Sequence, residues 1–228
     1  MLTTIEKIIF IVLASGCFGA SYFTFTKMFR VIGLGKDPIE WKKVAQNWKA
    51  GVDAFISQKT LFKTRPVVGF IHALVAWGFS LYLFVNIIDV LYGLIPHFKF
   101  FPNHFIGNIY RVFVDIFTVL VLLGVIYFLI RRFVLKDKRL QTNTPVMISD
   151  SALKGMRFDS LLVGSFIIVH VGSRFLSASF EIAGSHSDWS QPAANIVAKM
   201  WSRLDPDTII VMEHITWWLA LGLILLFL

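Results

Sequence analysis

The sequence predicts an all-α integral membrane protein, built as a five-helix bundle with its N-terminus outside the cell. Of its 228 residues, 56% are apolar and only 16% are charged, and the mean hydropathy is +0.70. This composition is typical of a chain surrounded by lipid. A transmembrane helix needs about 20 apolar residues to cross about 30 Å of hydrocarbon. Five segments approach this length, namely residues 8–29, 66–95, 104–130, 158–182 and 208–228.

The loops between these segments indicate the orientation. Residues 27–65 contain nine Lys or Arg against three acidic residues, and residues 131–157 contain seven against two. Because basic loops remain in the cytoplasm, we expect these two loops inside and the N-terminus outside, in a multi-pass membrane protein. This topology, together with phospholipid contacts, accounts for the formal charge of +8 without nucleic-acid binding. Docking of an acidic cytoplasmic domain is an additional use that these loops allow.

The cysteine content and the last residues indicate that any iron–sulfur cluster lies outside this sequence. Cys17 is the single cysteine, so the sequence holds neither a disulfide nor a Cys-ligated iron–sulfur cluster. Any such cluster is expected on an extension or a partner. The sequence stops at Leu228 in an apolar run without a polar anchor, so we expect the natural chain to continue. The first apolar segment has no evident cleavage site, and we expect it to remain as a helix.

Three histidines lie inside predicted spans, at His72, His170 and His214. Ionisable groups in a membrane core are costly, which makes each of them a functional candidate. Neutral imidazole is a ligand that suits haem iron. The histidines are therefore predicted to bind b-type haem. The alternative is that each one forms a hydrogen bond across the bundle or lines a proton path.

Depth in the membrane suggests how these histidines pair. At about 1.5 Å per residue, His170 lies about 18 Å and His214 about 21 Å from the cytoplasmic face, whereas His72 lies about 9 Å from it. We therefore expect an outer haem held by His170 and His214. An inner haem would be held by His72 and a ligand beyond Leu228. His104, at the start of the third span, is an alternative outer ligand closer to the surface.

Other charged residues also fall within or beside the spans. Arg111 and Arg174 lie toward the outer half, where a guanidinium group can bind a haem propionate or a quinone carbonyl. Pairing with Asp115 or Asp89 is the equally reasonable alternative. Asp89, Asp115 and Glu213 are candidates for proton carriers.

Two motifs resemble a known family. The order of the spans resembles the cytochrome b (gamma) subunit of respiratory nitrate reductases. The stretches RPVVGFIHALVAWGF and EHITWWLALGLILLF resemble the membrane domain of heterodisulfide-reductase-like iron–sulfur oxidoreductases of the electron-transfer-flavoprotein:menaquinone oxidoreductase type. The resemblance implies two b haems with His72 and His214 among the ligands, and menaquinone as the electron-exchange partner. It also implies iron–sulfur clusters on a cytoplasmic extension, which this sequence lacks.

These observations together predict a membrane cytochrome b that transfers electrons between a cytoplasmic iron–sulfur or flavoprotein partner and the menaquinone pool. A transporter and a membrane anchor without redox activity are the two alternatives. A transporter would favour interrupted helices or an inverted repeat. The sequence shows neither.

Overall fold

The computed structural model describes residues 2–35, 40–96, 98, 100–101, 104–137, 140 and 149–227. Within these residues the chain is helical and contains no β-strand, which confirms the all-α prediction. Five of the described helices are long and apolar enough to cross a membrane. These are α1 (Thr4–Gly33), α4 (Pro66–Leu94), α5 (Phe105–Leu129), α6 (Asp150–Gly184) and α8 (Pro206–Phe227).

The long helices match the five apolar segments to within one or two residues, except that α1 and α6 extend well beyond theirs. The α1 helix begins four residues before its segment, because Thr3 and Glu6 form a capping box in which each side chain accepts a hydrogen bond from the other residue's backbone N–H. The α6 helix begins eight residues early, where the Ser149 side chain caps it by accepting from the Ala152 N–H. Polar caps thus set helix ends that hydropathy alone does not locate.

Shorter helical elements occupy the connections, which the sequence assigned to loops. Two helices join α1 to α4, a π-helical turn continues α5, and a short helix with a 3₁₀ turn joins α6 to α8. In chain order they are α2 (Trp41–Ser57), α3 (Lys59–Thr64), η1 (Ile130–Val134), α7 (Pro192–Ala198) and η3 (Lys199–Trp201).

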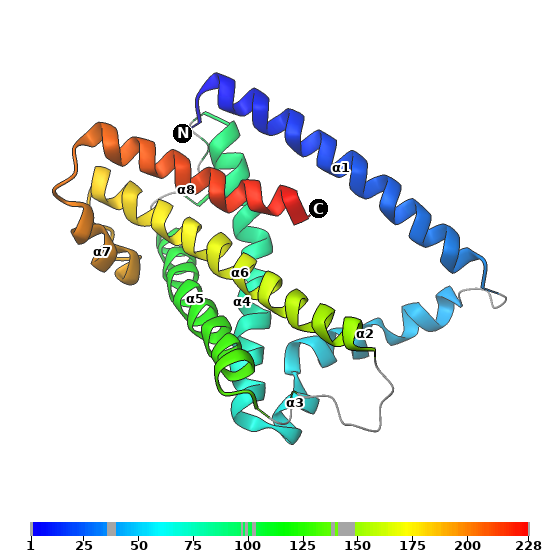
Figure 1. Ribbon diagram of the computed structural model, residues 1–228. Coiled ribbons are helices and arrows are strands. Elements are labelled where there is room, and N and C mark those ends of the chain that lie inside the picture. The colour runs from blue at the N-terminus through cyan, green and yellow to red at the C-terminus, as the bar shows by residue number, and fades with distance from the viewer. Residues whose placement is uncertain are drawn as a thin grey trace.

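Helices α6 and α8 form an antiparallel pair through the middle of the molecule (Figure 1). Gly184, the last residue of α6, packs against Ile209 near the start of α8. At the other end of the pair, the ring centroids of Phe166 and Phe227 are 3.8 Å apart. These contacts define the register between the two helices that carry His170 and His214.

Small residues allow α4 and α5 to approach closely. Gly78 packs directly against the Val121 side chain, and a Cβ atom at Gly124 would lie only 2.6 Å from Val75 Cγ2. Close packing over small residues is a main source of helix association in lipid, where no hydrophobic force drives helices together. The α4–α5 contact therefore depends on Gly78 and Gly124.

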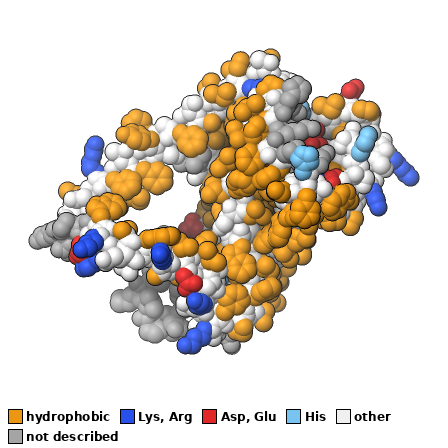
Figure 2. Space-filling model, turned by 180° about the vertical axis from the view of Figure 1, so that it is seen from behind, with side chains coloured by type: hydrophobic (Ala, Val, Ile, Leu, Met, Phe, Trp, Pro, Cys, Tyr) orange, Lys and Arg blue, Asp and Glu red, His pale blue; other side chains and the backbone are white. Residues whose placement is uncertain are grey.

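Helix α1 joins the bundle at its N-terminal end and then diverges from it (Figure 1). Phe10 packs edge-on against Trp217 and Trp218 of α8, with centroid distances of 5.2 and 6.0 Å. Figure 2 shows open space framed by the α1–α2 arm and the rest of the molecule. Hydrophobic side chains cover much of the middle of that face.

The close contact between Gly78 and Val121 predicts that a larger residue at position 78 destabilises the protein. We expect Gly78→Val to lower the free energy of unfolding by about 1–3 kcal/mol, because the added methyl groups overlap with Val121. Gly16→Val on α1 is the matched control, since no atom lies within 4 Å of a Cβ at that position. Thermal unfolding in detergent micelles measures both variants. Equal unfolding temperatures for the two would contradict the packing argument.

Candidate functional site

A polar cavity of about 70 Å³ lies where α4, α6 and α8 meet the start of α1. It is at the end of the bundle that carries the chain's N-terminus, which the sequence predicts to be outside. This volume has room for a few water molecules. Its ionisable and phenolic lining residues are Asp89, Tyr92, Arg174, Glu181, Glu213 and His214.

His214 is held in place by a carboxylate from another helix. Its Nδ1 atom lies 2.9 Å from Glu6 Oε1 and 3.1 Å from Glu6 Oε2. Trp218, one turn further along α8, donates its indole N–H to Glu6 Oε1 at 3.1 Å. A carboxylate accepts, so Nδ1 carries a proton, and in a neutral ring the lone pair is then on Nε2. This is how a metal-binding histidine is commonly oriented.

Glu6 is a functional residue that the sequence analysis missed. Its only local signal is the Thr3-to-Glu6 capping-box spacing, which indicates a helix start and gives no hint of His214. The Glu6 carboxylate thus closes the first turn of α1 and binds two side chains of α8. Glu181 was missed as well, and it accepts a hydrogen bond from the Tyr92 hydroxyl at 3.3 Å.

His170 is anchored in a similar way but in apolar surroundings. It is 2% exposed, and its Nδ1 atom lies 2.8 Å from the backbone carbonyl oxygen of Ala220. Because a carbonyl only accepts, Nδ1 donates here too. Its Nε2 atom faces Asn86 of α4 at 3.4 Å, and the Asn86 Oδ1 atom is buried without a partner among the described residues. The Phe166 ring stacks on the imidazole at 5.9 Å.

The sequence analysis expected His170 and His214 to lie at the same depth. The structure places them at different depths. His170 lies beside Ala220, which is six residues or about 9 Å further along α8 than His214. Ala178 of α6 lines the same cavity as His214, eight residues or about 12 Å beyond His170. The estimate counted from the ends of apolar segments, and these ends do not define how far two helices slide past each other.

His72 occupies a third depth. It lies on α4, 14 residues or about 21 Å before the Asn86 that faces His170. Its side chain is exposed, and its ring centroid is 6.3 Å from that of Phe128. The described residues contain no cluster of three or more His, Cys, Asp or Glu side chains that could hold a metal ion. His104, the alternative outer ligand, is exposed just before α5.

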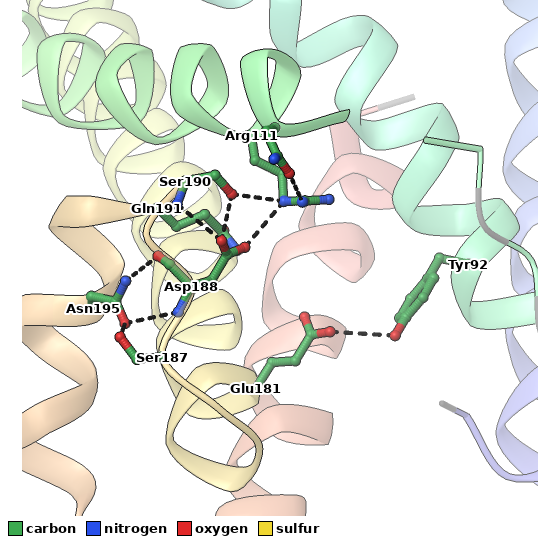
Figure 3. A network of polar contacts seen from close by, with 9 residues as sticks. Tyr92, Arg111, Glu181, Ser187, Asp188, Ser190, Gln191 and Asn195 are labelled. Carbon is green, nitrogen blue, oxygen red and sulfur yellow. Dashed lines mark hydrogen bonds and ion pairs between the residues drawn. The ribbon is translucent and has the colours of Figure 1, made fainter. Parts of the chain in front are cut away.

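Arg174 and Arg111 both form ion pairs. Arg174 Nε binds Asp89 at 3.0 Å, which is the pairing considered as the alternative to a cofactor contact. Arg111 Nε binds Asp188 at 3.1 Å and the Ser190 hydroxyl at 2.8 Å, in the connection after α6. Figure 3 shows this polar network around Asp188. Arg111 therefore does not pair with Asp115.

Asp115 has a structural role at the start of α7. Its two carboxylate oxygens accept hydrogen bonds from the backbone N–H groups of Ala193, at 2.7 Å, and Ala194, at 3.1 Å. A carboxylate at a helix N-terminus satisfies donors that have no partner within the helix. Asp115 thereby fastens the α6–α8 connection to α5, and nothing in this geometry supports a role as a proton carrier.

The network around Asp188 affects how the protein responds to acid. Partial burial by itself would raise the pKa of Asp188. Hydrogen bonds from Ser190 and Gln191 and the charge of Arg111 outweigh burial and hold this pKa below its usual range. A depressed carboxylate pKa contributes stability that is present at neutral pH and is lost as the pH falls through the folded-state pKa.

We expect Asp188→Asn to destabilise the protein by about 1–2 kcal/mol at pH 7. The difference in stability from the wild-type protein should narrow as the pH falls through the folded-state pKa of Asp188, which lies below its usual range, because the wild-type carboxylate then becomes protonated as well. Thermal unfolding followed by tryptophan fluorescence provides the measurement. Asp53→Asn, in the exposed ion pair with Lys59, serves as a control with little effect at either pH. A gap for Asp188→Asn that does not depend on pH would refute the assignment.

Comparison with known proteins gives one relative. No protein-family model and no solved structure matches the chain. A protein of Syntrophomonas wolfei subsp. wolfei named EtfAB:quinone oxidoreductase is 26% identical over 216 residues, which cover 90% of this chain and 28% of that protein. The chain therefore spans little more than a quarter of the length of the relative it matches, and is similar to it over nearly its whole own length.

Proposed function

We propose that this chain is the haem-carrying membrane part of an oxidoreductase that exchanges electrons with quinone. The observation that carries the proposal is the hydrogen bonding of the imidazole rings of two histidines within the predicted spans. His170 and His214 each donate Nδ1–H to a fixed acceptor from another helix, which makes Nε2 the nitrogen that a metal would use; in the structure, His170 Nε2 accepts from the Asn86 amide at 3.4 Å. The relative's name, which combines EtfAB with a quinone, supports the same class of reaction.

The donor set fits b-type haem. Neutral imidazole with an oriented Nδ1–H is the state required of an axial ligand. When bound, haem supplies one-electron transfer. We propose His214, His170 and His72 as ligands at three successive depths. His170 Nδ1 contacts the α8 backbone, and its Nε2 atom accepts a hydrogen bond from the Asn86 side chain of α4, so a haem bound by His170 would replace the Asn86 contact on the α4 side.

The residues around His214 can exchange protons with the solvent side of the bundle. Tyr92 and Glu181 are hydrogen-bonded to each other and line the same cavity as Glu213. Trp217 adds a buried indole N–H that has no partner among the described residues. We propose that this cavity moves protons for quinone chemistry, with menaquinone as the expected species. The N-terminus outside and a bacterial cytoplasmic membrane belong to the same proposal.

The cytoplasmic partner is proposed on similar grounds. The chain corresponds to a limited part of its relative, and its single cysteine excludes an iron–sulfur cluster of its own. We propose that iron–sulfur clusters on an extension or partner subunit, and an electron-transfer flavoprotein, supply or accept the electrons. Arg111 and Arg174, which form ion pairs in the structure, remain candidates for contacts with a haem propionate or quinone.

A visible spectrum tests the haem assignment. We expect the purified protein to show a reduced-minus-oxidised spectrum of b haem, with haem per chain determined as pyridine haemochrome. His214→Ala, His170→Ala and His72→Ala should each lose haem or change its spectrum, because each removes a ligand. His186→Ala is the matched control on an exposed loop, where the ring contacts its neighbour Ser185. Absence of haem from the cofactor-replete protein would overturn the proposal.

The Glu6 carboxylate gives a second test that does not depend on activity. We expect Glu6→Gln to weaken haem retention about 10–100-fold, because the partner that orients His214 loses its charge. Transfer of haem to excess apomyoglobin measures retention. Glu40→Gln, which removes an exposed carboxylate paired with Lys43, is the control and should behave like the wild-type protein. Equal transfer rates for all three proteins would show that Glu6 does not act through His214.

A further inference from the structure

Helix α2 carries an apolar stripe that no part of the described bundle covers. None of its residues is buried. Five apolar side chains recur at spacings of three or four residues, which places them on one side of the helix. Their exposed fractions range from 45% to 71%, and they are Trp41, Val44, Trp48, Val52 and Phe55.

The opposite side of α2 is polar and basic. Lys42, Gln46, Lys49 and Asp53 lie there, between the edges of the apolar stripe. From residue 40 to residue 65 the chain has six Lys or Arg against two acidic residues, Glu40 and Asp53. Two of these cations form exposed ion pairs with the acids, at 2.8 and 2.9 Å. The net charge of this segment is therefore positive.

The position of α2 brings its apolar stripe to the level of the membrane. Trp77 of α4 donates its indole N–H to the carbonyl oxygen of Ile56, at the end of α2, over 3.0 Å. Trp77 lies 11 residues, or about 16 Å, inside α4 from Pro66. The intervening α4 residues, VVGFIHALVA, are apolar except for His72. The end of α2 thus lies beside the apolar length of α4 and does not project beyond it.

Helix α2 is connected at both ends to helices that are long and apolar enough to span a membrane. The chain reaches it from α1, and α3 then packs back against the start of α4, where Gly69 approaches the Leu61 carbonyl. With 17 residues and a continuous polar side, α2 is too short and too polar to span a bilayer. A tethered helix with one apolar and one basic side is the pattern of a helix that lies in the membrane interface.

We propose that α2 is an in-plane helix that lies in the boundary between phospholipid headgroups and acyl chains. The stripe from Trp41 to Phe55 is immersed in lipid, and the lysines on the other side contact anionic headgroups. Lipid, and not a protein partner, is the occupant because α2 lies at the level of an apolar span and its charge complements an anionic membrane surface. This inference does not depend on haem or quinone.

Spin labels on the full-length chain in lipid nanodiscs test the position of α2. Cys17→Ser provides a cysteine-free background, and Val44→Cys and Val52→Cys place labels on the stripe. Gln46→Cys and Ala50→Cys are the matched controls on the opposite side. All four positions are exposed, so labelling leaves the bundle intact, which circular dichroism verifies. Power saturation compares collision with oxygen, which partitions into lipid, and with a water-soluble nickel chelate.

We expect the stripe labels to collide several-fold more often with oxygen relative to nickel than the control labels do. Stripe labels as accessible to nickel as the controls would overturn the proposal, because the stripe would then face water. Labels protected from both reagents would also overturn it, since a protein surface, such as a second copy or an acidic domain, would then cover α2.

Changing the charge of the lipid tests whether the lysines of α2 contact anionic headgroups. We expect the oxygen preference of the Val44→Cys label to be greater in nanodiscs of phosphatidylcholine and phosphatidylglycerol than in phosphatidylcholine alone. The added changes Lys42→Gln and Lys49→Gln should remove this difference, because they neutralise the basic side. A lipid dependence that persists in the neutralised variant, or none in the parent, would refute the headgroup contacts.

Discussion

The bundle depends on hydrogen bonds and ion pairs that join polar side chains of different helices inside the apolar part of the protein. Hydrocarbon offers no hydrogen-bonding partner, so the spans form helices and their polar side chains must meet across helix boundaries. Four contacts between long helices accordingly contain a polar interaction. Arg174–Asp89 joins α6 to α4, Tyr82–Thr118 joins α4 to α5 at 2.6 Å, His170–Ala220 joins α6 to α8, and Glu6–His214 joins α1 to α8.

Much of this framework could be predicted from the sequence, because span length and hydropathy are local properties. The five apolar segments lie in the five long helices, and all three intramembrane histidines were identified as exceptional. The relative depth of His170 and His214 could not be predicted. It depends on the packing of Gly184 against Ile209 and on the α7 connection, which together decide how far α8 slides along α6.

The ion-pair and hydrogen-bond partners of most charged residues could not be predicted from the sequence either. Glu6 lies just before the predicted first span and 208 residues from His214, so no spacing rule connects them. Arg111 binds Asp188 because the chain after α6 turns back toward α5, and Asp115 holds that turn by capping α7. Such pairs are decided by tertiary packing. The Arg174–Asp89 pair is one that the sequence analysis named, as the alternative to a cofactor contact.

The surroundings of the two anchored histidines differ in a way that bears on redox tuning. His214 lies beside the Glu6 carboxylate and in a cavity lined by Asp89, Glu181 and Glu213. His170 is enclosed by the Phe166 and Tyr82 rings, donates to the Ala220 carbonyl oxygen and contacts the uncharged Asn86 amide. Negative groups stabilise a cationic centre, whereas an apolar enclosure disfavours added charge. If haem binds as proposed, the Glu6 carboxylate would stabilise the oxidised form of a centre at His214 relative to one at His170, where the imidazole contacts no carboxylate.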